Sequence, residues 1–532
     1  MKKTILKILS TLVFAFLYYY FLLPPINIHS FAFWMFIIFV VGFYLLASVC
    51  VLSINELETI INKGKVQNKV NSKAIIISFC SIFVIFFLIF LINIICSPLF
   101  MSKSYYERIN IETGDFSKDI PVVDFDKLAL LDKDSSQKLG DRVMGQMTDL
   151  VSQFDVSNLY TQINYKNTIV RVTPLEYSGL IKYFTNRKNG VAGYITVNSV
   201  NGEANLVRLD KGMKYVPSAL FGEDLYRKLR FSYPTEIFGD ISFEIDEEGN
   251  PYWIAQTIEY TAVGLKKEVS GVIVLNPIDG TSVKYDSKDI PTWIDHVYSA
   301  ELIIDQVNDW GSYKNGFFNS IFGQKEVVMT TEGYNYLAMN DDVYLYTGIT
   351  SVVADESNIG FILTNLRTKE TKLYNVAGAE EYSAMASAEG QVQQMNYTST
   401  FPLIINLNNK PTYLMSLKDN AGLVKMYAFV DYSDYQKVVV TDSSEGIVKA
   451  AQNYLGDNII TDNLKEITIK IDDISTSVLD GTTYYYIKSN NNIYRASIKT
   501  NQNILPFIKI NDKVKVSYNE AEINEVIKIE FK

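Results

Sequence analysis

The sequence predicts three transmembrane α-helices, followed by an α+β ectodomain of tandem hairpin-helix-hairpin repeats and a small C-terminal all-β barrel. Three observations predict this fold class. Long apolar runs are confined to the first hundred residues, a Gly-Asn-Gly spacing recurs in the middle of the chain, and the C-terminal region alternates short β-prone runs with turn residues. We expect a transmembrane region over 1–98, a linker and helix over 99–157, the repeats over 158–455 and the barrel over 465–532.

Three apolar runs are long enough to cross a bilayer, which takes about 20 helical residues. They cover Thr4–Leu23, Phe31–Leu52 and Ala74–Ile95. A cleaved signal peptide is the alternative for the first run. The length of that run, the lack of a small-residue cleavage site and the second run close behind it argue against this alternative.

The lysines predict the orientation of these spans, because cytoplasmic loops retain positive charge. They cluster around the start of the first run and between the second and third runs: Lys2, Lys3, Lys7, Lys63, Lys65, Lys69 and Lys73. We therefore expect a multi-pass protein of the cell membrane with a cytoplasmic N-terminus and an extracellular ectodomain after Pro98. Asn93 is the strongly polar side chain of the third run, and a helix-packing hydrogen bond or an interfacial position is favoured over a transport site.

Between the linker and the barrel, the informative feature is an internal repeat. Gly193–Gly202 aligns without gaps to Gly271–Gly280, and Gly360–Lys369 keeps the same spacing. Each copy predicts a strand, a tight turn and a second strand, because glycine or asparagine at the turn supplies the positive φ that such a reversal often needs. A helix and a further hairpin follow in each copy.

The helices of the three copies are expected at Ala219–Leu229, Thr292–Val307 and Ala379–Gln393. In the second copy, Thr292-Trp-Ile-Asp295 has the spacing of a capping box. The hairpins after the helices are expected at Phe243–Thr257, Tyr336–Thr347 and Ile405–Ser416. Ile237-Phe-Gly239 in the first copy is matched by Ile321-Phe-Gly323 in the second. Upstream of the repeats, Asp134 or Ser135 is expected to cap the helix of the linker region.

The C-terminal region reads as five short strands. They are Lys465–Thr476, Thr482–Lys488, Ile493–Lys499, Lys513–Tyr518 and Ile523–Phe531. Asp480-Gly481 and Asn490-Asn491 predict hairpin turns, as Asn340-Asp341 does in the second repeat. Five strands in so short a segment indicate a small barrel similar to an OB-fold. Tyr484-Tyr-Tyr486 could stack on a sugar or a base, but alternating packing within a strand is favoured.

The element order and the Gly-Asn-Gly spacing over Asn158–Tyr435 resemble the PepSY and cystatin-like modules of bacterial envelope proteins. More broadly, Asp289–Asp295 and Leu417–Met426 resemble a family of uncharacterised membrane-anchored surface proteins of Gram-positive bacteria. The resemblance implies an envelope location and supplies no catalytic residues.

Cysteine and histidine are too few in this sequence for most metal or disulfide chemistry. Cys50, Cys80 and Cys96 all fall inside or at the edge of the apolar runs, so the ectodomain has neither a disulfide framework nor a thiolate metal site. His29 and His296 are the only histidines, which excludes a multi-histidine centre. We therefore predict no metal and no cofactor.

Common catalytic motifs are also absent from the sequence, which has no GxSxG elbow, HExxH, P-loop or GxGxxG fingerprint. Ser135-Ser-Gln-Lys138 matches Ser-x-x-Lys, but its partner motifs are missing and a helix start explains it. Asp246-Glu-Glu-Gly-Asn250 is rich in oxygen ligands but lacks the calcium-binding loop, so a hairpin turn is favoured. His296 beside Asp295 could form an acid–base pair, although a solvated surface position is favoured. No catalytic, cofactor-binding or metal-binding residue is assigned.

These features favour a membrane-anchored extracytoplasmic binding or scaffold protein of a cell-envelope complex. Its expected partners are the lipid bilayer and envelope proteins or wall polymer. The net charge of -10 argues against nucleic acid, and the 36 tyrosines suit a binding surface. The alternatives are an envelope hydrolase or a PepSY-like peptidase modulator, and a sensor subunit. A hydrolase would require carboxylates brought together by the fold, and a non-enzymatic role is favoured.

Overall fold

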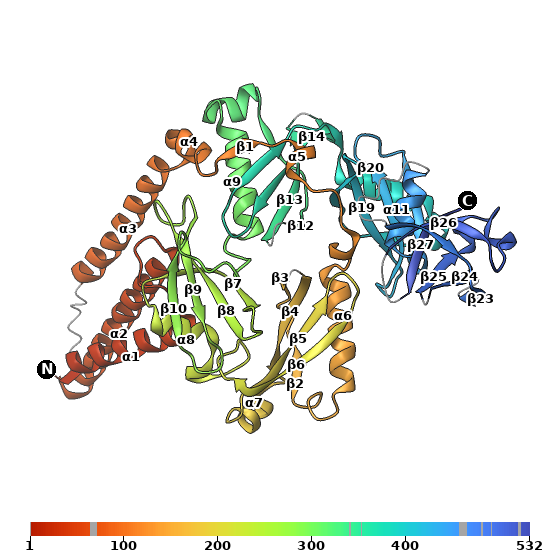
Figure 1. Ribbon diagram of the computed structural model, residues 1–532. Coiled ribbons are helices and arrows are strands. Elements are labelled where there is room, and N and C mark those ends of the chain that lie inside the picture. Colours follow the sequence, from red (N-terminus) through yellow and green to blue (C-terminus); the bar gives the residue numbers. More distant parts are fainter. Residues whose placement is uncertain are drawn as a thin grey trace. The chain divides into compact units, whose positions relative to one another are not determined.

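The computed structural model describes residues 2–63, 72–166, 168–339, 342–352, 354–456, 465–479, 482–490, 492–519 and 523–532. The chain divides into two compact units, Met1–Val440 and Thr441–Lys532. Most of the lysine-rich loop (64–71) lies outside the described residues, as do the turns predicted at Asn340-Asp341 and Asp480-Gly481 and the second residue of the turn at Asn490-Asn491. Figure 1 shows the order of the elements along the chain.

Two N-terminal helices, α1 (Lys2–Leu22) and α2 (Phe31–Lys63), are long and apolar enough to cross a membrane. The third predicted span forms α3 (Ser72–Ile95), which is followed after a bend of 50° by α4 (Pro98–Tyr106). Pro98 lacks the backbone N–H that an unbroken helix needs, which explains the break. Among the described residues the structure therefore shows two candidate spans, or three if the bent pair is counted as one, where the sequence predicted three.

The segment predicted as a linker takes part in the fold. Its strand β1 (Ile111–Thr113) pairs in parallel with β15 (Thr371–Tyr374), and Phe116 and Ile120 are buried. It ends in α6 (Lys133–Gln146). The cap of α6 is Asp132, whose carboxylate accepts a hydrogen bond from the Ser135 amide (3.0 Å), rather than the predicted Asp134 or Ser135.

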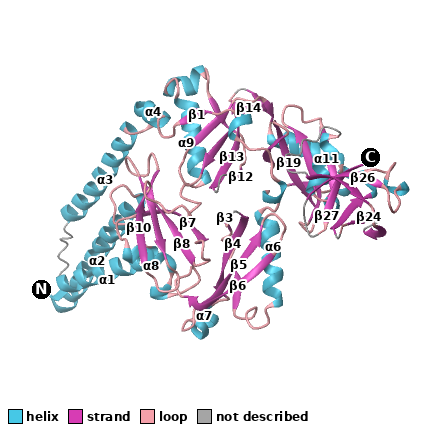
Figure 2. Ribbon diagram, in the orientation of Figure 1, coloured by secondary structure: helices cyan, strands magenta, loops and turns pink. Residues whose placement is uncertain are grey.

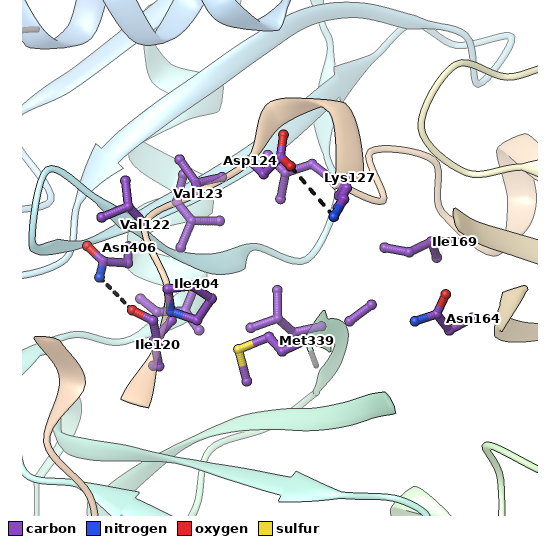
Figure 3. Close-up of a pocket in the computed structure, with 15 residues that line it drawn as sticks. Ile120, Val122, Val123, Asp124, Lys127, Asn164, Ile169, Met339, Ile404 and Asn406 are labelled. Atoms are coloured by element: carbon purple, nitrogen blue, oxygen red, sulfur yellow. Dashed lines mark hydrogen bonds and ion pairs between the residues drawn. The ribbon is translucent and has the colours of Figure 1, made fainter. Parts of the chain in front are cut away.

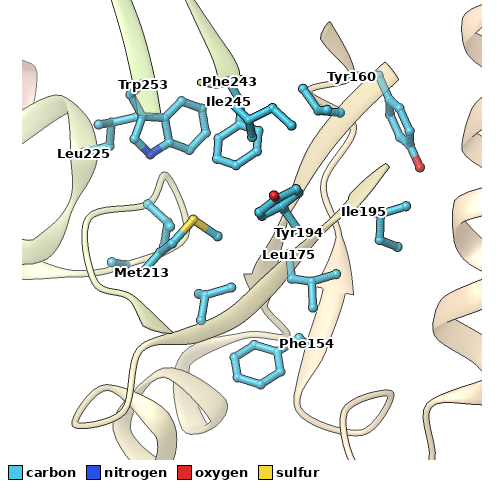
Figure 4. Close-up of a cluster of buried hydrophobic side chains, with 14 of the residues drawn as sticks. Phe154, Tyr160, Leu175, Tyr194, Ile195, Met213, Leu225, Phe243, Ile245 and Trp253 are labelled. Atoms are coloured by element: carbon cyan, nitrogen blue, oxygen red, sulfur yellow. The ribbon is translucent and has the colours of Figure 1, made fainter. Parts of the chain in front are cut away.

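The first two sheets share one hydrophobic core. The first has the order β2-β4-β5-β6 with β3 also paired to β4, and the second has the order β10-β9-β8-β7. Their strands are β2 (Phe154–Val156), β3 (Thr161–Tyr165), β4 (Thr168–Tyr177), β5 (Val191–Asn198), β6 (Ala204–Met213), β7 (Ile237–Ile245), β8 (Pro251–Glu259), β9 (Glu268–Leu275) and β10 (Ser282–Asp286). Trp253 is fully buried between them, with its ring 5.2 Å from that of Phe243 and its indole N–H donated to the Tyr215 carbonyl (Figure 4). Helix α6 lies on the other face of the first sheet (Figure 1).

The third and fourth sheets complete the first unit. The third has the order β1-β15-β14-β13-β11, with β12 on β13 and β16 on β14; the fourth has the order β17-β19-β20-β21, with β18 on β19. Their remaining strands are β11 (Val328–Thr330), β12 (Asn335–Met339), β13 (Asp342–Ser351), β14 (Ala354–Asn365), β16 (Gly378–Ala379), β17 (Thr398–Ser399), β18 (Leu403–Leu407), β19 (Lys410–Lys418), β20 (Val424–Asp431) and β21 (Val438–Asp442). Helix α9 (Ala300–Tyr313) packs with the second and third sheets, and α10 (Glu381–Gln391) with the third and fourth.

The region after α4 is mostly β-structure (Figure 2), whereas the sequence predicted an α+β ectodomain. The first hairpin expected in each repeat copy forms, as β5–β6, β9–β10 and β14–β15. The helix expected in the first copy is shorter, since α8 covers Leu225–Ser232.

The prediction for the second copy is wrong at the start of the helix. Its helix α9 begins at Ala300 rather than Thr292, because Asp295 and the residues after it are held by bonds to other sheets. The Val297 and Tyr298 amides both donate to the Leu366 carbonyl, which prevents helical bonding there. Ile321-Phe-Gly323 lies in a short π-helix (Asn319–Gly323), whereas the matched Ile237-Phe-Gly239 begins strand β7. The hairpin expected at Tyr336–Thr347 falls on the paired strands β12 and β13.

In the second unit, the described residues form a six-stranded sheet in the order β22-β26-β27-β25-β24-β23. The strands are β22 (Lys465–Lys470), β23 (Asp473–Leu479), β24 (Thr482–Ser489), β25 (Asn492–Ser497), β26 (Lys513–Asn519) and β27 (Asn524–Phe531), and α11 (Ile447–Leu455) belongs to the same unit. The first predicted strand is split because Ile471 bonds to Asp512 while Asp472 bonds to Lys488. Among the described residues β22 and β23 are not paired, so the closed barrel stays a prediction.

Candidate functional site

A cavity of about 570 Å³ lies among strands of all four sheets of the first unit. Its walls are residues 129–133, 159–162, 334–336, 400–401 and 414–416, together with Arg171, Ile241, Ser242, His296 and Leu403. We name it the Arg171 pocket. The walls are tied together by hydrogen bonds, since the Asn335 amide nitrogen donates to the Phe401 carbonyl (2.9 Å) and the Ser416 hydroxyl donates to the Leu130 carbonyl (3.2 Å).

Arg171 reaches this pocket from the middle of β4. In the antiparallel register it lies directly opposite Gln162 of β3, so both side chains point to the same face of the sheet. The flanking Val170 and Val172 point to the other face and are buried in the core. Strand alternation therefore aims a cation and an amide at one point of the cavity wall.

The guanidinium of Arg171 is buried without a charge partner. The residue is 8% exposed, its Nε has no hydrogen-bond partner, and no ion pair joins it to the described residues. The nearby Asp132 is already engaged, because its carboxylate pairs with Lys418 and caps α6. Burial lowers the pKa of Arg171 to about 10, against the opposing effect of the Asp132 carboxylate, so the group is still positively charged at neutral pH.

The side-chain amide of Gln162 is the second unused donor. Gln162 is almost fully buried, and its Nε2 has no hydrogen-bond partner among the described residues. Because buried polar groups in proteins are nearly always bonded, two neighbouring donors without partners are unusual. They indicate a position where an acceptor from outside the chain can bind.

His296 and two tyrosines form another part of the wall. The His296 Nε2 lies 2.6 Å from the Gln162 carbonyl oxygen, and the imidazole meets the ring of Tyr336 edge-on at 5.8 Å. Tyr336 is in turn 5.6 Å from Tyr334. The structure thus gives His296 a half-buried place in the pocket, where the sequence favoured a solvated surface position.

Asp295, the predicted acid–base partner of His296, has a structural bond of its own. Its buried carboxylate accepts a hydrogen bond from the backbone amide of Asn164 (2.6 Å), and its own backbone amide donates to the buried Glu244 carboxylate (3.0 Å). The two carboxylates are thus engaged by backbone amides of other segments. Both accept bonds that join β3 and β7 to the segment before α9, which is a structural role.

A second cavity of about 380 Å³, mostly apolar, adjoins the first along the same strands (Figure 3). It is lined by the residues that follow next in β12 and β18, Leu337–Met339 and Ile404–Asn406. Asn406 donates to the Ile120 carbonyl (2.7 Å), which holds the segment before α6 across this cavity. In the part of the chain that the structure describes, the buried Oδ1 atoms of Asn164 and Asn406 have no hydrogen-bond partner.

The remaining residues considered from the sequence have structural surroundings. Ser135 and Lys138 lie in the first turns of α6, and Lys138 donates to the Ala421 carbonyl. Asp246 closes the turn between β7 and β8 by accepting from the Asn250 amide (2.8 Å). Within the part of the chain that the structure describes, no three histidine, cysteine or carboxylate side chains are grouped to hold a metal ion.

Two further sequence features have clear contacts. Asn93 at the end of α3 donates to the Val263 carbonyl (3.0 Å) and accepts from its backbone amide (3.1 Å), so it bonds to the loop between β8 and β9 rather than to another helix. In β24, Tyr485 packs against the core of the second unit, and the guanidinium of Arg495 lies 5.5 Å from the ring of Tyr484.

A buried carboxylic acid was not identified from the sequence. Glu381, at the start of α10, is fully buried and accepts hydrogen bonds from the Tyr346 hydroxyl (2.7 Å) and the Asn358 amide (3.3 Å). Burial raises its pKa above the usual value. This group is enclosed beside the hydrophobic core that the third and fourth sheets form with α10, and it lines neither of the two cavities described above.

Comparison of the chain with models of known protein families and with curated protein sequences gives no match. The assignment of a site therefore depends on the geometry of the Arg171 pocket.

Proposed function

We propose that the chain is a membrane-anchored extracytoplasmic binding protein whose Arg171 pocket takes an anionic group of its ligand, a carboxylate or a phosphate. The observation that carries this proposal is the buried guanidinium of Arg171, which lines a cavity without any charge partner. The adjacent Gln162 amide supplies a second free donor.

The chemistry of the pocket fits such a ligand. A guanidinium binds carboxylate or phosphate oxygens in a planar, two-point arrangement and retains its charge. Burying an unpaired charge costs free energy, which a bound anion offsets. Tyr334, Tyr336 and Phe401 add flat apolar faces for the rest of the ligand.

The size of the cavity sets the kind of ligand. Pockets for small molecules span roughly 300–1,000 Å³, and the Arg171 pocket falls within this range. It suits a small molecule or one unit of an acidic wall polymer. Binding of an envelope protein would use the exposed sheet edges instead. The absence of any response to small anions in the tests below would favour this alternative.

The pocket supports binding rather than hydrolysis. Asp132 is the one carboxylate among its lining residues, and it is paired with Lys418. Cleavage of a glycosidic bond by paired carboxylates needs two that face the substrate. The envelope hydrolase, peptidase modulator and sensor subunit therefore have no specific observation in their favour.

Anchoring and topology belong to the same proposal. The α3–α4 pair serves as a third span, the N-terminus is cytoplasmic, and the β-rich region lies outside the cell in a complex of the Gram-positive envelope. The repeats act as PepSY-like modules and the C-terminal unit as an OB-like barrel. Protease added to intact protoplasts should cleave the β-rich region, and complete protection of that region would overturn the topology.

Ligand binding can be tested on the full-length protein in detergent. We expect inorganic phosphate, succinate or glucuronate, compared with chloride at equal ionic strength, to raise the midpoint of thermal unfolding. A ligand at a hundred times its dissociation constant adds about 2.7 kcal/mol of stability. The anion with the largest effect distinguishes a phosphate ligand from a carboxylate ligand.

Two arginine variants make this test specific. Arg171→Gln should abolish the response, whereas Arg187→Gln, which breaks an exposed ion pair with Glu223, should retain it. An equal response in both variants, or none in the unmodified protein, would refute an anion site at Arg171.

A further inference from the structure

A group of exposed apolar side chains lies on the short helix α7 (Leu180–Asn186) and the 3-10 turn Phe221–Glu223. Its members are Leu180, Ile181, Phe184 and Phe221, which are between 54% and 76% exposed. The rings of Phe184 and Phe221 are 6.4 Å apart, so the two segments form one surface. We name it the α7 patch. A contiguous apolar surface of this kind marks a contact with another molecule or a membrane.

The α7 patch is held together by hydrogen bonds beneath it. The buried Tyr183 of α7 donates its hydroxyl to the Glu223 carboxylate (2.7 Å) and lies 3.1 Å from the Leu220 carbonyl oxygen. Arg187, one turn further along, pairs with Glu223. The patch is therefore a fixed part of the surface.

Helix α8 (Leu225–Ser232) connects this patch to the end of the first candidate span. The guanidinium of Arg227 donates both to the Phe221 carbonyl (2.6 Å) and to the Tyr20 carbonyl near the end of α1 (3.2 Å). Phe231, on the same helix, meets the ring of Tyr19 edge-on at 5.5 Å. Figure 1 shows α8 beside the end of α1.

We infer that the α7 patch inserts into the outer leaflet of the membrane that α1 and α2 cross. Aromatic residues near the end of a span, such as Tyr19 and Tyr20, mark the depth of the lipid headgroups. Because Arg227 bonds to Tyr20 and to Phe221 at once, the patch begins at that depth. Lipid acyl chains cover its apolar side chains.

The charges next to the patch match the headgroup region. Lys182 lies within α7 and the exposed Lys188 follows it, and neither is ion-paired within the described part of the chain. Lysine side chains extend from an apolar surface toward lipid phosphates. This inference depends on the proposed anchoring through α1 and α2, but not on the Arg171 pocket.

The inference can be tested by spin labelling of the full-length protein in vesicles of phosphatidylcholine and phosphatidylglycerol. The native Cys50, Cys80 and Cys96 are replaced by serine, and one cysteine is introduced by Ile181→Cys or, as a second variant, Phe184→Cys. Val13→Cys in α1 is the reference inside the bilayer. Leu423→Cys, exposed in the turn between β19 and β20, is the reference in water. The measured quantity is the collision rate of the label with oxygen relative to a water-soluble nickel chelate.

We expect the labels at Ile181 and Phe184 to favour oxygen, as the label at Val13 does. If both behave like the label at Leu423 while Val13 favours oxygen, the α7 patch is exposed to water and the inference is wrong. If the label at Val13 itself favours the nickel chelate, the anchoring fails and the inference fails with it.

Discussion

Replacement of two arginines by methionine should change stability in opposite directions. Arg171 is buried without a charge partner, whereas Arg367 donates two hydrogen bonds, of 2.6 and 2.7 Å, to the buried Asp342 carboxylate. Methionine keeps most of the aliphatic length and removes the charge. Arg171→Met should therefore stabilise the protein by about 1–3 kcal/mol, because it removes the cost of burying an unpaired cation. Arg367→Met should destabilise it by about 3–5 kcal/mol, because it leaves Asp342 buried without its cation.

The assay is urea unfolding of both full-length variants in detergent, without added phosphate or carboxylates, followed by tryptophan fluorescence, to which the buried Trp253 contributes. A stabilised Arg171→Met variant that no longer responds to anions would show that Arg171 serves binding at the expense of stability. A loss of more than about 1 kcal/mol in Arg171→Met would refute the reasoning, because it would mean that the guanidinium is stabilised within the fold.

Three further predictions concern other parts of the first unit. Burial raises the pKa of Glu381, so the folded protein holds a proton that the unfolded chain releases, and stability should fall as the pH rises above the ordinary value of 4.5. Glu381→Gln keeps an acceptor for the Tyr346 hydroxyl, so it should remove this decline and raise the urea midpoint at neutral pH. A midpoint lower than that of the unmodified protein would contradict a raised pKa at Glu381. Asn93→Leu leaves the Val263 amide and carbonyl without their partners, at a cost of about 1–3 kcal/mol. It should speed proteolysis of the loop between β8 and β9, and unchanged cleavage would show that Asn93 does not hold this loop. Trp253→Ala should cost about 3–5 kcal/mol in thermal unfolding, and a loss below about 1 kcal/mol would mean that the first core collapses around the cavity.

Local patterns in the sequence predict many of the single elements. Each Gly-Asn-Gly segment becomes a hairpin, as in Gly193–Gly202, because the turn residues and the alternating strands around them act over a few positions. The start of α9 fails for the opposite reason. The amides of Val297 and Tyr298 bond to Leu366, about seventy positions later, and no local signal predicts such a contact.

The sequence does not predict the candidate site, although it singles out His296, which lines the pocket. Arg171 is the polar residue between the apolar Val170 and Val172. In an isolated strand this alternation indicates a solvent-facing position for the arginine. The structure makes it a buried position because a third and a fourth sheet close over that face. His296 stood out as one of two histidines, but its place beside Gln162 depends on the same closure.

The parallel pairing of β1 with β15 has a consequence for biosynthesis. Ile111 leaves the ribosome 371 - 111 = 260 residues before its partner Thr371. At about 5–20 residues per second, this strand waits roughly 10–50 s before its partner is made. This strand is thus among the first parts of the β-rich region to be made and among the last to be paired. A polypeptide that stops short of β15 leaves this strand open to aggregation, and a chaperone would have most reason to protect it during that interval.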